Sequence, residues 1–203
     1  MHIYMNDTDV EIIDKRTVYR GYFTIDRYRL RHRLHCGEMS QAIEREVVER
    51  GHVAAVLPLD FQREKVILIE QFRPGAFAAK DDPWLIECVA GIIEPDETAE
   101  QVARRETLEE TGCRLDTVVP IQTFFTTPGA LTETVHLYYG ITDSRGIGGI
   151  HGASHEGEDI KVHVLSVEQA LDRAKQGNIR NAITLIALQW LTIYYHDLKI
   201  KHI

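Results

Sequence analysis

Cysteine is scarce in this chain: the 203 residues include only three, and no two of them have CxxC spacing. The three are Cys36, Cys88 and Cys113. An odd, sparse set without that spacing predicts neither a disulfide framework nor a zinc knuckle. Such cysteine usage is typical of a reducing compartment, so we expect the protein in the cytoplasm.

Clusters of positive charge and long apolar runs are also missing. The chain has 23 Lys and Arg against 31 Asp and Glu, a formal net charge of −8, and its basic residues are scattered. This pattern argues against a general binder of nucleic acid or of membrane surfaces. The longest apolar stretch, residues 182–195, contains polar residues and falls short of the roughly 20 residues of a membrane span. Residues 1–14 are acidic where a signal peptide is basic, so we expect no secretion signal and no membrane segment.

The sequence is rich in strand patterns in its first half and in helix signals later. The apolar and alternating runs predict strands over residues 10–13, 22–34, 43–48, 52–59, 66–72, 84–90, 118–125, 134–141 and 160–165. Capping patterns and apolar spacing predict helices over about 98–111, 167–176 and 181–196. The Gly/His/acid-rich residues 144–159 are expected to form a mobile loop. We therefore predict an α+β fold, with an antiparallel strand-rich arm over 1–50 and a mixed sheet with helices over 51–203.

The helix expected over residues 98–111 carries acidic side chains on its apolar stripe. At 100° per residue the members of that stripe are Ala99, Val102, Ala103, Glu106, Glu109 and Glu110. Glu106 and Glu110 are one turn apart and repel each other, so a cation should compensate them. Carboxylates without thiolates suit Mg²⁺ or Mn²⁺, and Mg²⁺ commonly also binds phosphate oxygens, which predicts a phosphorylated substrate. The alternative is an ordinary solvated helix face.

Residues 91–113 resemble the Nudix box, the pattern Gx5Ex7REUxEExGU in which U is apolar. Seven specified positions are in register: Gly91, Glu97, Arg105, Glu106, Glu109, Glu110 and Gly112. Thr107 departs from the pattern at the first apolar position, whereas Cys113 fills the second. The resemblance implies a Nudix fold, with a mixed β-sheet core sandwiched by helices. It also implies hydrolysis of a nucleoside diphosphate linked to another group.

The resemblance further implies a metal site. Glu106 and Glu110 are expected to be the principal ligands, with Glu109 as an additional ligand that also serves catalysis. Ala90 would contribute its backbone carbonyl oxygen. The expected ion is Mg²⁺, with Mn²⁺ as a substitute.

The remaining box residues have supporting roles in the resemblance. Arg105 would orient the glutamates, and Glu97 is its expected ion-pair partner. Gly91 and Gly112 are expected to be structural.

Beyond the box, the chain is similar to bacterial ADP-ribose pyrophosphatases. Pro128, sixteen residues after Gly112, matches a proline typical of that subgroup. In those enzymes the general base lies on a flexible loop, which maps onto the Gly/His-rich segment here. Glu156 is the predicted base, and Glu158 is a second candidate or a metal-assisting carboxylate. The similarity also implies a homodimer in which the arm of residues 1–50 is exchanged between subunits.

Four residues in matching segments are candidates for substrate binding. Tyr22 would stack on adenine, Arg45 and Arg73 would bind phosphates, and Glu133 would hold a ribose hydroxyl. The alternatives are a place in the core of the arm for Tyr22, and pairing with nearby glutamates for both arginines.

The sequence thus predicts Mg²⁺-dependent hydrolysis of ADP-ribose to AMP and ribose 5-phosphate. One alternative keeps the chemistry but changes the substrate to GDP-mannose or another nucleotide sugar. Another is a Nudix module that senses nucleotides without cleaving them.

Overall fold

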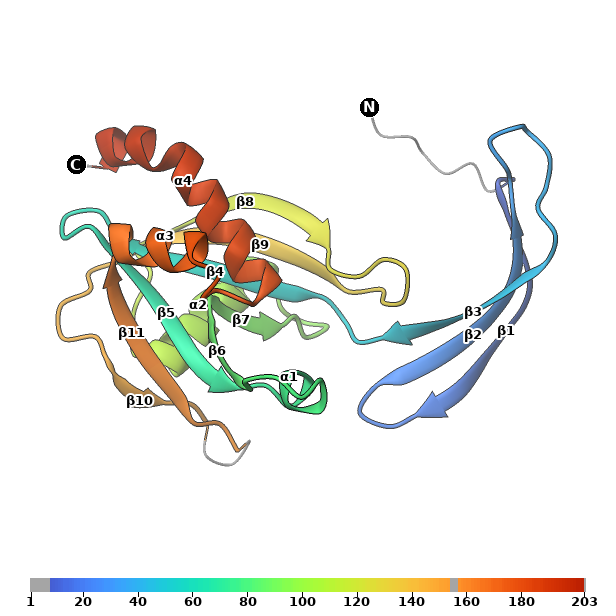
Figure 1. The fold of residues 1–203 in the computed structure, drawn as a ribbon, viewed down its shortest axis with the longest axis horizontal. Coiled ribbons are helices and arrows are strands. Elements are labelled where there is room, and N and C mark those ends of the chain that lie inside the picture. Colours follow the sequence, from blue (N-terminus) through green and yellow to red (C-terminus); the bar gives the residue numbers. More distant parts are fainter. Residues whose placement is uncertain (1–7, 154–156, 203) are drawn as a thin grey trace. The chain divides into compact units, whose positions relative to one another are not determined.

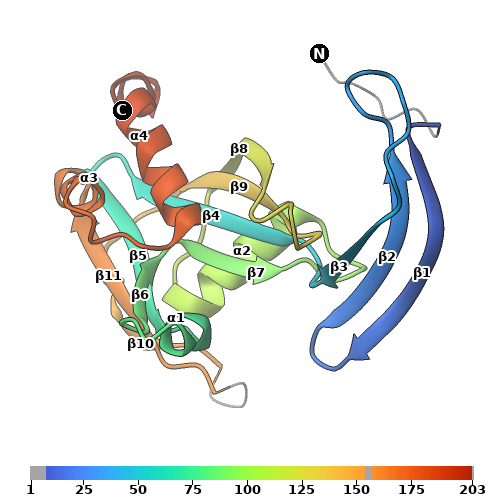
Figure 2. The same ribbon diagram turned by 45° about the vertical axis from the view of Figure 1, so that its right-hand side comes forward.

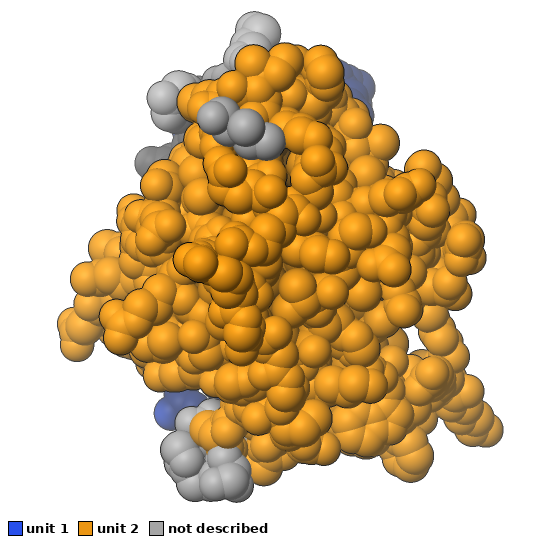
Figure 3. Space-filling model, turned by 90° about the vertical axis from the view of Figure 1, so that its left-hand side faces the viewer, with its two compact units in different colours: residues 1–51, 125–133 blue, residues 52–124, 134–203 orange. Residues whose placement is uncertain are grey.

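The computed structural model describes residues 8–153 and 157–202 of the chain. These residues belong to two compact units, coloured separately in Figure 3. Unit 1 comprises Met1–Gly51 and Phe125–Glu133, and unit 2 comprises His52–Phe124 and Thr134–Ile203.

Over the described residues the structure contains eleven strands and four helices, labelled in Figure 1. In chain order they are β1 (Val10–Arg20), β2 (Thr24–His32), β3 (Ile43–Glu49), β4 (Val53–Asp60), β5 (Lys65–Phe72), α1 (Pro74–Ala78), β6 (Trp84–Glu87), β7 (Val89–Ile92), α2 (Ala99–Thr111), β8 (Thr117–Phe125), β9 (Thr134–Ile141), β10 (Gly149–His151), β11 (Ile160–Ser166), α3 (Val167–Lys175) and α4 (Ala182–His202). None of the helices in the described residues is both long enough and apolar enough to cross a membrane.

Unit 1 is a three-stranded antiparallel sheet in the order β1-β2-β3. The segment Phe125–Glu133 joins it through a parallel bridge between Val48 and Leu131. Large apolar side chains are exposed on this unit: Ile12, Ile13, Val18, Tyr19, Tyr22, Phe23 and Leu34. A sheet of three strands needs a buried hydrophobic face to be stable, and β1 is exposed along nearly its whole length.

Unit 2 is built on a mixed sheet in the order β10-β11-β5-β4-β9-β8, with β6 paired to β5 and β7 paired to β4. β4 and β9 are parallel, whereas the other pairs with recorded register are antiparallel. β4 is buried along its whole length because helices cover both faces of the sheet (Figures 1 and 2). Leu57 packs with residues of α3 and α4, and its neighbour Val56 packs with Ala103 of α2. The predicted fold class is confirmed: a mixed sheet between helices.

The helix that carries the acidic stripe begins and ends as the sequence predicts. Thr98 is its N-cap: Gln101 N–H donates to Thr98 Oγ1 (3.2 Å), and Thr98 N–H donates to Gln101 Oε1 (2.8 Å). Gly112 ends the helix in the left-handed region, at φ 70°. Ser166 and Gln169 form the second predicted capping box, before α3. These local hydrogen bonds explain why the sequence alone locates both helix starts.

The strand predicted over residues 84–90 is wrong in one respect, because the structure divides it into β6 and β7. At the break, Cys88 N–H donates to Thr184 Oγ1 on α4 at 2.7 Å. The strand pairing also changes there, since β6 pairs with β5 and β7 pairs with β4. A continuous apolar run gives no sign of such a change of partner.

Three further segments differ from the prediction. The predicted turn after β5 contains the short helix α1, which begins at Pro74, a favoured residue for the first helical position. Part of the predicted loop 144–159 is the strand β10, which pairs with β11. α4 continues past His196 to His202, because residues 197–202 contain neither glycine nor proline to stop it.

Candidate metal centre

The carboxylate of Glu106 lies directly against strand β7. α2 packs on β7, and a Cβ atom added to Gly91 of that strand would collide with Oε1 and Cδ of Glu106. Only a residue without a side chain permits this close approach. Burial raises the pKa of Glu106, although Arg105 opposes that shift.

Glu110, one helical turn further, is the most deeply buried acid of the helix, with 4% of the residue exposed. Burial, together with the charges of Glu106 and Glu158, raises the pKa of Glu110 to about 9. The charge of Arg73 and the backbone of Ala90 act in the opposite direction. Within the described residues its Oε2 atom is buried without any hydrogen-bond partner. An unsatisfied buried carboxylate oxygen is costly, so it marks a position where a ligand would be stabilising.

Arg105 connects the acids of the box. Its Nε and Nη2 atoms donate to the two carboxylate oxygens of Glu97 at 2.9 and 3.0 Å. Its Nη1 atom donates to Glu106 Oε1 at 2.9 Å and to Glu109 Oε2 at 3.1 Å. Hydrogen bonding to Glu97 raises the pKa of Arg105, so this side chain is a fixed positive charge.

Glu109 does not lie on the inward face, and this part of the helical-wheel prediction is wrong: 57% of its side chain is exposed. The buried stripe is rotated toward Thr107 and Thr111, which the prediction left out. Their hydroxyl groups are satisfied inside the helix, since Thr107 donates to Ala103 O at 2.6 Å and Thr111 donates to Thr107 O. A threonine therefore fits the apolar position of the box, and the role of Glu109 as a ligand stays a prediction.

Glu158 approaches the same centre from the segment before β11. Its charge raises the pKa of both Glu106 and Glu110, though less than burial does. Its Oε2 atom accepts a hydrogen bond from Ala153 N–H at 3.0 Å. The predicted base, Glu156, lies outside the described residues.

Arg73 belongs to the same region of unit 2, and its guanidinium pairs with a glutamate, which is the alternative that the sequence left open. The sequence did not identify Glu87 as that partner. Nε and Nη2 of Arg73 donate to the carboxylate of Glu87 at 2.6 to 3.1 Å. Burial opposes the charge of Arg73, but Glu87, Glu110 and Glu158 together raise its pKa. A single acid inside the apolar run of residues 84–90 was the signal that could have identified Glu87.

The other three substrate candidates belong to unit 1. Tyr22 is 84% exposed and contacts the ring of Phe23 edge-on. Arg45 donates to the carbonyl oxygen of the adjacent Glu44 at 2.7 Å. Glu133 is buried, accepts a hydrogen bond from Thr126 and pairs with Arg50; its role as a ribose-binding group stays a prediction.

The acidic centre has the chemistry of a site for a hard cation. Across residues 8–153 and 157–202, no three acidic, histidine or cysteine side chains already converge on one point. The local features nevertheless fit a divalent ion: an unpartnered buried oxygen on Glu110, a second carboxylate on Glu106, and the strand residue Ala90 beside Glu110. Oxygen donors of this kind suit Mg²⁺ or Mn²⁺.

Comparisons with known proteins agree with this geometry. The NUDIX domain family matches residues 38–185. The chain is 48% identical over 191 residues to a protein of Escherichia coli (strain K12) named ADP-ribose pyrophosphatase, covering 94% of this chain and 91% of that protein. It is 33% identical over 186 residues to a GDP-mannose pyrophosphatase of Cronobacter sakazakii, covering 91% and 96% of the two chains. A crystal structure titled ADP compounds hydrolase has a similar fold, with a TM-score of 0.72, 17% identity and coverage of 94% and 96%.

The contact between Gly91 and Glu106 leads to a prediction about metal affinity. In Gly91→Ala the new methyl group displaces the flexible end of Glu106, so we expect Mn²⁺ affinity to fall about tenfold with little loss of folding stability. Titration calorimetry and thermal unfolding measure the two effects. Gly75→Ala is the matched control, because a Cβ there meets nothing within 4 Å. Unchanged Mn²⁺ affinity in Gly91→Ala would contradict the assigned role of this glycine.

Proposed function

Since this chain belongs to the Nudix family, we propose that it is a hydrolase that cleaves the pyrophosphate of ADP-ribose to AMP and ribose 5-phosphate. The observation that carries the proposal is the buried Glu110 beside the partly buried Glu106, because the unpartnered oxygen of Glu110 suits a cation that in turn binds a pyrophosphate. The substrate follows from the name of the E. coli relative, which matches the chain over 94% of its length.

The cation is proposed to be Mg²⁺, with Mn²⁺ as a substitute. Glu106, Glu110 and the carbonyl oxygen of Ala90 would hold it, with Glu109 and Glu158 as further ligands. When bound, such an ion neutralises phosphate charge and makes a bound water more acidic.

The chain's own residues supply orientation and proton transfer. Arg105 fixes Glu106, because one guanidinium bonds both that carboxylate and Glu97. Arg73 is proposed to donate to a phosphate oxygen of the substrate, since guanidinium groups bind such oxygens directionally. A carboxylate on the segment before β11, Glu156 or Glu158, would accept the proton of the attacking water.

GDP-mannose is the second candidate substrate, because the chain is 33% identical to a GDP-mannose pyrophosphatase. The higher identity to an ADP-ribose pyrophosphatase favours ADP-ribose. A module that binds nucleotides without cleaving them is less favoured, since every charged position of the box is retained.

A substrate panel tests the proposed activity. At saturating Mg²⁺ we expect ADP-ribose to have a higher kcat/KM than GDP-mannose, with AMP and ribose 5-phosphate as products. Glu106→Gln should lose orders of magnitude in kcat/KM, because a principal metal ligand is removed. Glu100→Gln, on the exposed side of the same helix, is the control and should retain activity. Faster turnover of GDP-mannose than of ADP-ribose would overturn the assignment of ADP-ribose as the substrate. Absence of turnover of either nucleotide sugar would favour a module that binds nucleotides without cleaving them.

The general base is tested by two isosteric substitutions. For Glu156→Gln we expect kcat to fall about 10²- to 10⁴-fold with KM little changed, because a base acts mainly in the transition state. Steady-state kinetics on Glu158→Gln provide the comparison. If Glu158→Gln loses more kcat than Glu156→Gln, the assignment of the base moves to Glu158.

We propose that the enzyme is a homodimer assembled through unit 1. The support is the sheet β1-β2-β3, which exposes Ile12, Ile13 and Val18 in a single chain. Burying exposed apolar side chains of β1 against a second copy would give the three-stranded sheet buried apolar contact area. An exchange of this arm between subunits remains the expectation stated from the sequence.

Two pairs of substitutions on β1 test the dimer. The double variant Ile12→Asp with Val18→Asp should be a monomer, because charged side chains replace apolar contact area in the dimer interface. Light scattering coupled to size-exclusion chromatography measures the mass. Asp14→Asn with Arg16→Gln changes polar exposed residues of the same strand and should leave the mass unchanged. A wild-type mass of one chain would overturn the proposal.

The cytoplasm is the proposed location. Cys36, Cys88 and Cys113 all lie in the described residues and all are free thiols. Free thiols are typical of reducing compartments.

A further inference from the structure

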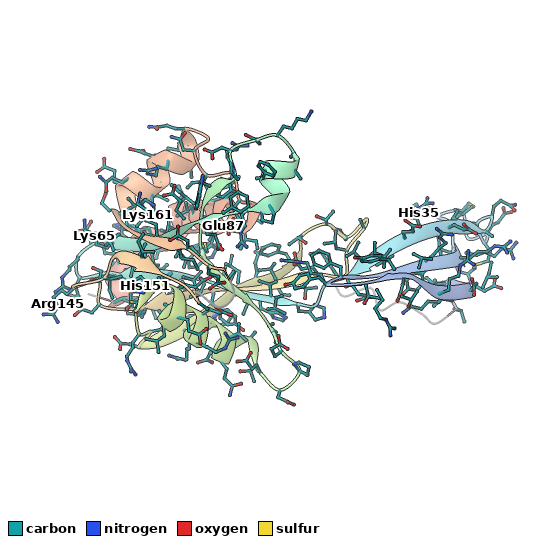
Figure 4. The ribbon with its side chains drawn as sticks, turned by 90° about the horizontal axis from the view of Figure 1, so that it is seen from below. His35, Lys65, Glu87, Arg145, His151 and Lys161 are labelled. Carbon is teal, nitrogen blue, oxygen red and sulfur yellow. The ribbon has the colours of Figure 1, made fainter. Side chains whose placement is uncertain are left out.

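An ion pair between the buried Glu87 and the partly exposed Arg73 lies near the acidic centre without belonging to the Nudix box. Glu87, at the end of β6, is 2% exposed and is labelled in the interior of unit 2 in Figure 4. Both of its carboxylate oxygens accept hydrogen bonds from Arg73, the shortest at 2.6 Å. A carboxylate in such a position is stable only with a partner of opposite charge. The paired contacts in turn fix the orientation of both the Glu87 carboxylate and the Arg73 guanidinium.

The charge of Arg73 also acts on two acids with which it does not pair. Beyond burial and the pairing with Glu87, the charges of Glu110 and Glu158 raise the pKa of Arg73, and Arg73 in turn lowers the pKa of Glu110. Yet among the described residues Arg73 forms an ion pair only with Glu87. Oε2 of Glu110 is meanwhile a buried acceptor without a partner in the same part of the chain.

A guanidinium donor and an unsatisfied buried acceptor would ordinarily form a hydrogen bond. An arginine has five N–H groups in a rigid fork, and here Nε and Nη2 are committed to Glu87. That commitment fixes the plane of the guanidinium. If the arginine reached Glu110 or Glu158, it would occupy the oxygens that a divalent cation needs.

We propose that Glu87 is a positioning residue that holds the guanidinium of Arg73 away from Glu110 and Glu158. The carboxylates are thereby kept free for a divalent cation, and Nη1 of Arg73 is kept for a phosphate oxygen. This inference rests on the metal site of the proposed function.

Binding of Mn²⁺ to the full-length protein without substrate is the principal test. In Glu87→Gln the neutral amide no longer holds Arg73, so we expect Mn²⁺ affinity to fall about tenfold, measured by electron paramagnetic resonance. The metal-free crystal structure of this variant should show Arg73 paired with Glu110 or Glu158. Unchanged affinity, or an Arg73 that remains beside position 87, overturns the proposal.

A second variant separates positioning from the loss of one negative charge. Arg73→Lys keeps both charges but replaces the fork by a flexible point charge that cannot make the paired contacts. We expect its Mn²⁺ affinity to fall as well, whereas affinity equal to wild type would overturn the proposal. Arg73→Lys also tests the positioning role if the Glu87→Gln variant does not fold. Glu87→Asp, which retains the carboxylate, should partly rescue Mn²⁺ binding relative to Glu87→Gln.

The failure of this inference can be told apart from failure of the metal site itself. The wild type should bind Mn²⁺, and Glu106→Gln should bind it much more weakly. If the wild type binds no Mn²⁺, both proposals are overturned. If the wild type binds and Glu106→Gln does not, while Glu87→Gln and Arg73→Lys match the wild type, only the positioning role of Glu87 is overturned.

Discussion

The burial of like-charged carboxylates at one end of α2 is the constraint on which the rest of the centre depends. Glu110 is buried with an unpartnered oxygen, and the charges of Glu106 and Glu158 raise its pKa further. Such an arrangement costs folding free energy unless a cation occupies it. Gly91 contributes to the same constraint, because the absence of its side chain lets the Glu106 carboxylate lie against β7.

The elements around the acidic centre are well satisfied, and their stability offsets the free-energy cost of the buried carboxylates. α2 has a complete capping box at Thr98 and a left-handed glycine at its end, and β4 beneath it is buried on both faces. Thr107 and Thr111 complete the buried side of the helix by bonding to backbone carbonyls within it. Local consistency of this kind around a buried acidic group without a partner is typical of a functional site.

The parts that the sequence predicted are those that depend on local spacing. The helix caps follow from neighbours within four residues along the chain, and the box residues follow from their spacing over residues 91–113. The sequence analysis placed Glu109 on the buried side of α2 because it defined that side by the apolar residues alone. Thr107 and Thr111 are also buried, so the buried side is rotated away from Glu109. The division between β6 and β7 and the pairing of Glu87 with Arg73 depend on contacts between distant segments, which no local pattern records. The roles of Tyr22, Arg45, Glu133 and Glu156 stay predictions.

Two arginines near the acidic centre are held in the same way, each by a glutamate that is not a proposed metal ligand. Arg105 is held by Glu97, and Arg73 is held by Glu87, each through Nε and Nη2. In both cases an acid outside the metal-binding group neutralises the guanidinium and fixes its direction. Carboxylates therefore outnumber guanidinium groups around Glu110, and the centre keeps the negative charge that attracts a divalent ion. The two arginines differ at the third nitrogen: Nη1 of Arg105 donates to Glu106 and Glu109, whereas among the described residues Arg73 forms an ion pair only with Glu87. Pairing with an outer glutamate therefore orients both guanidinium groups, and it keeps the carboxylate oxygens clear only in the case of Arg73.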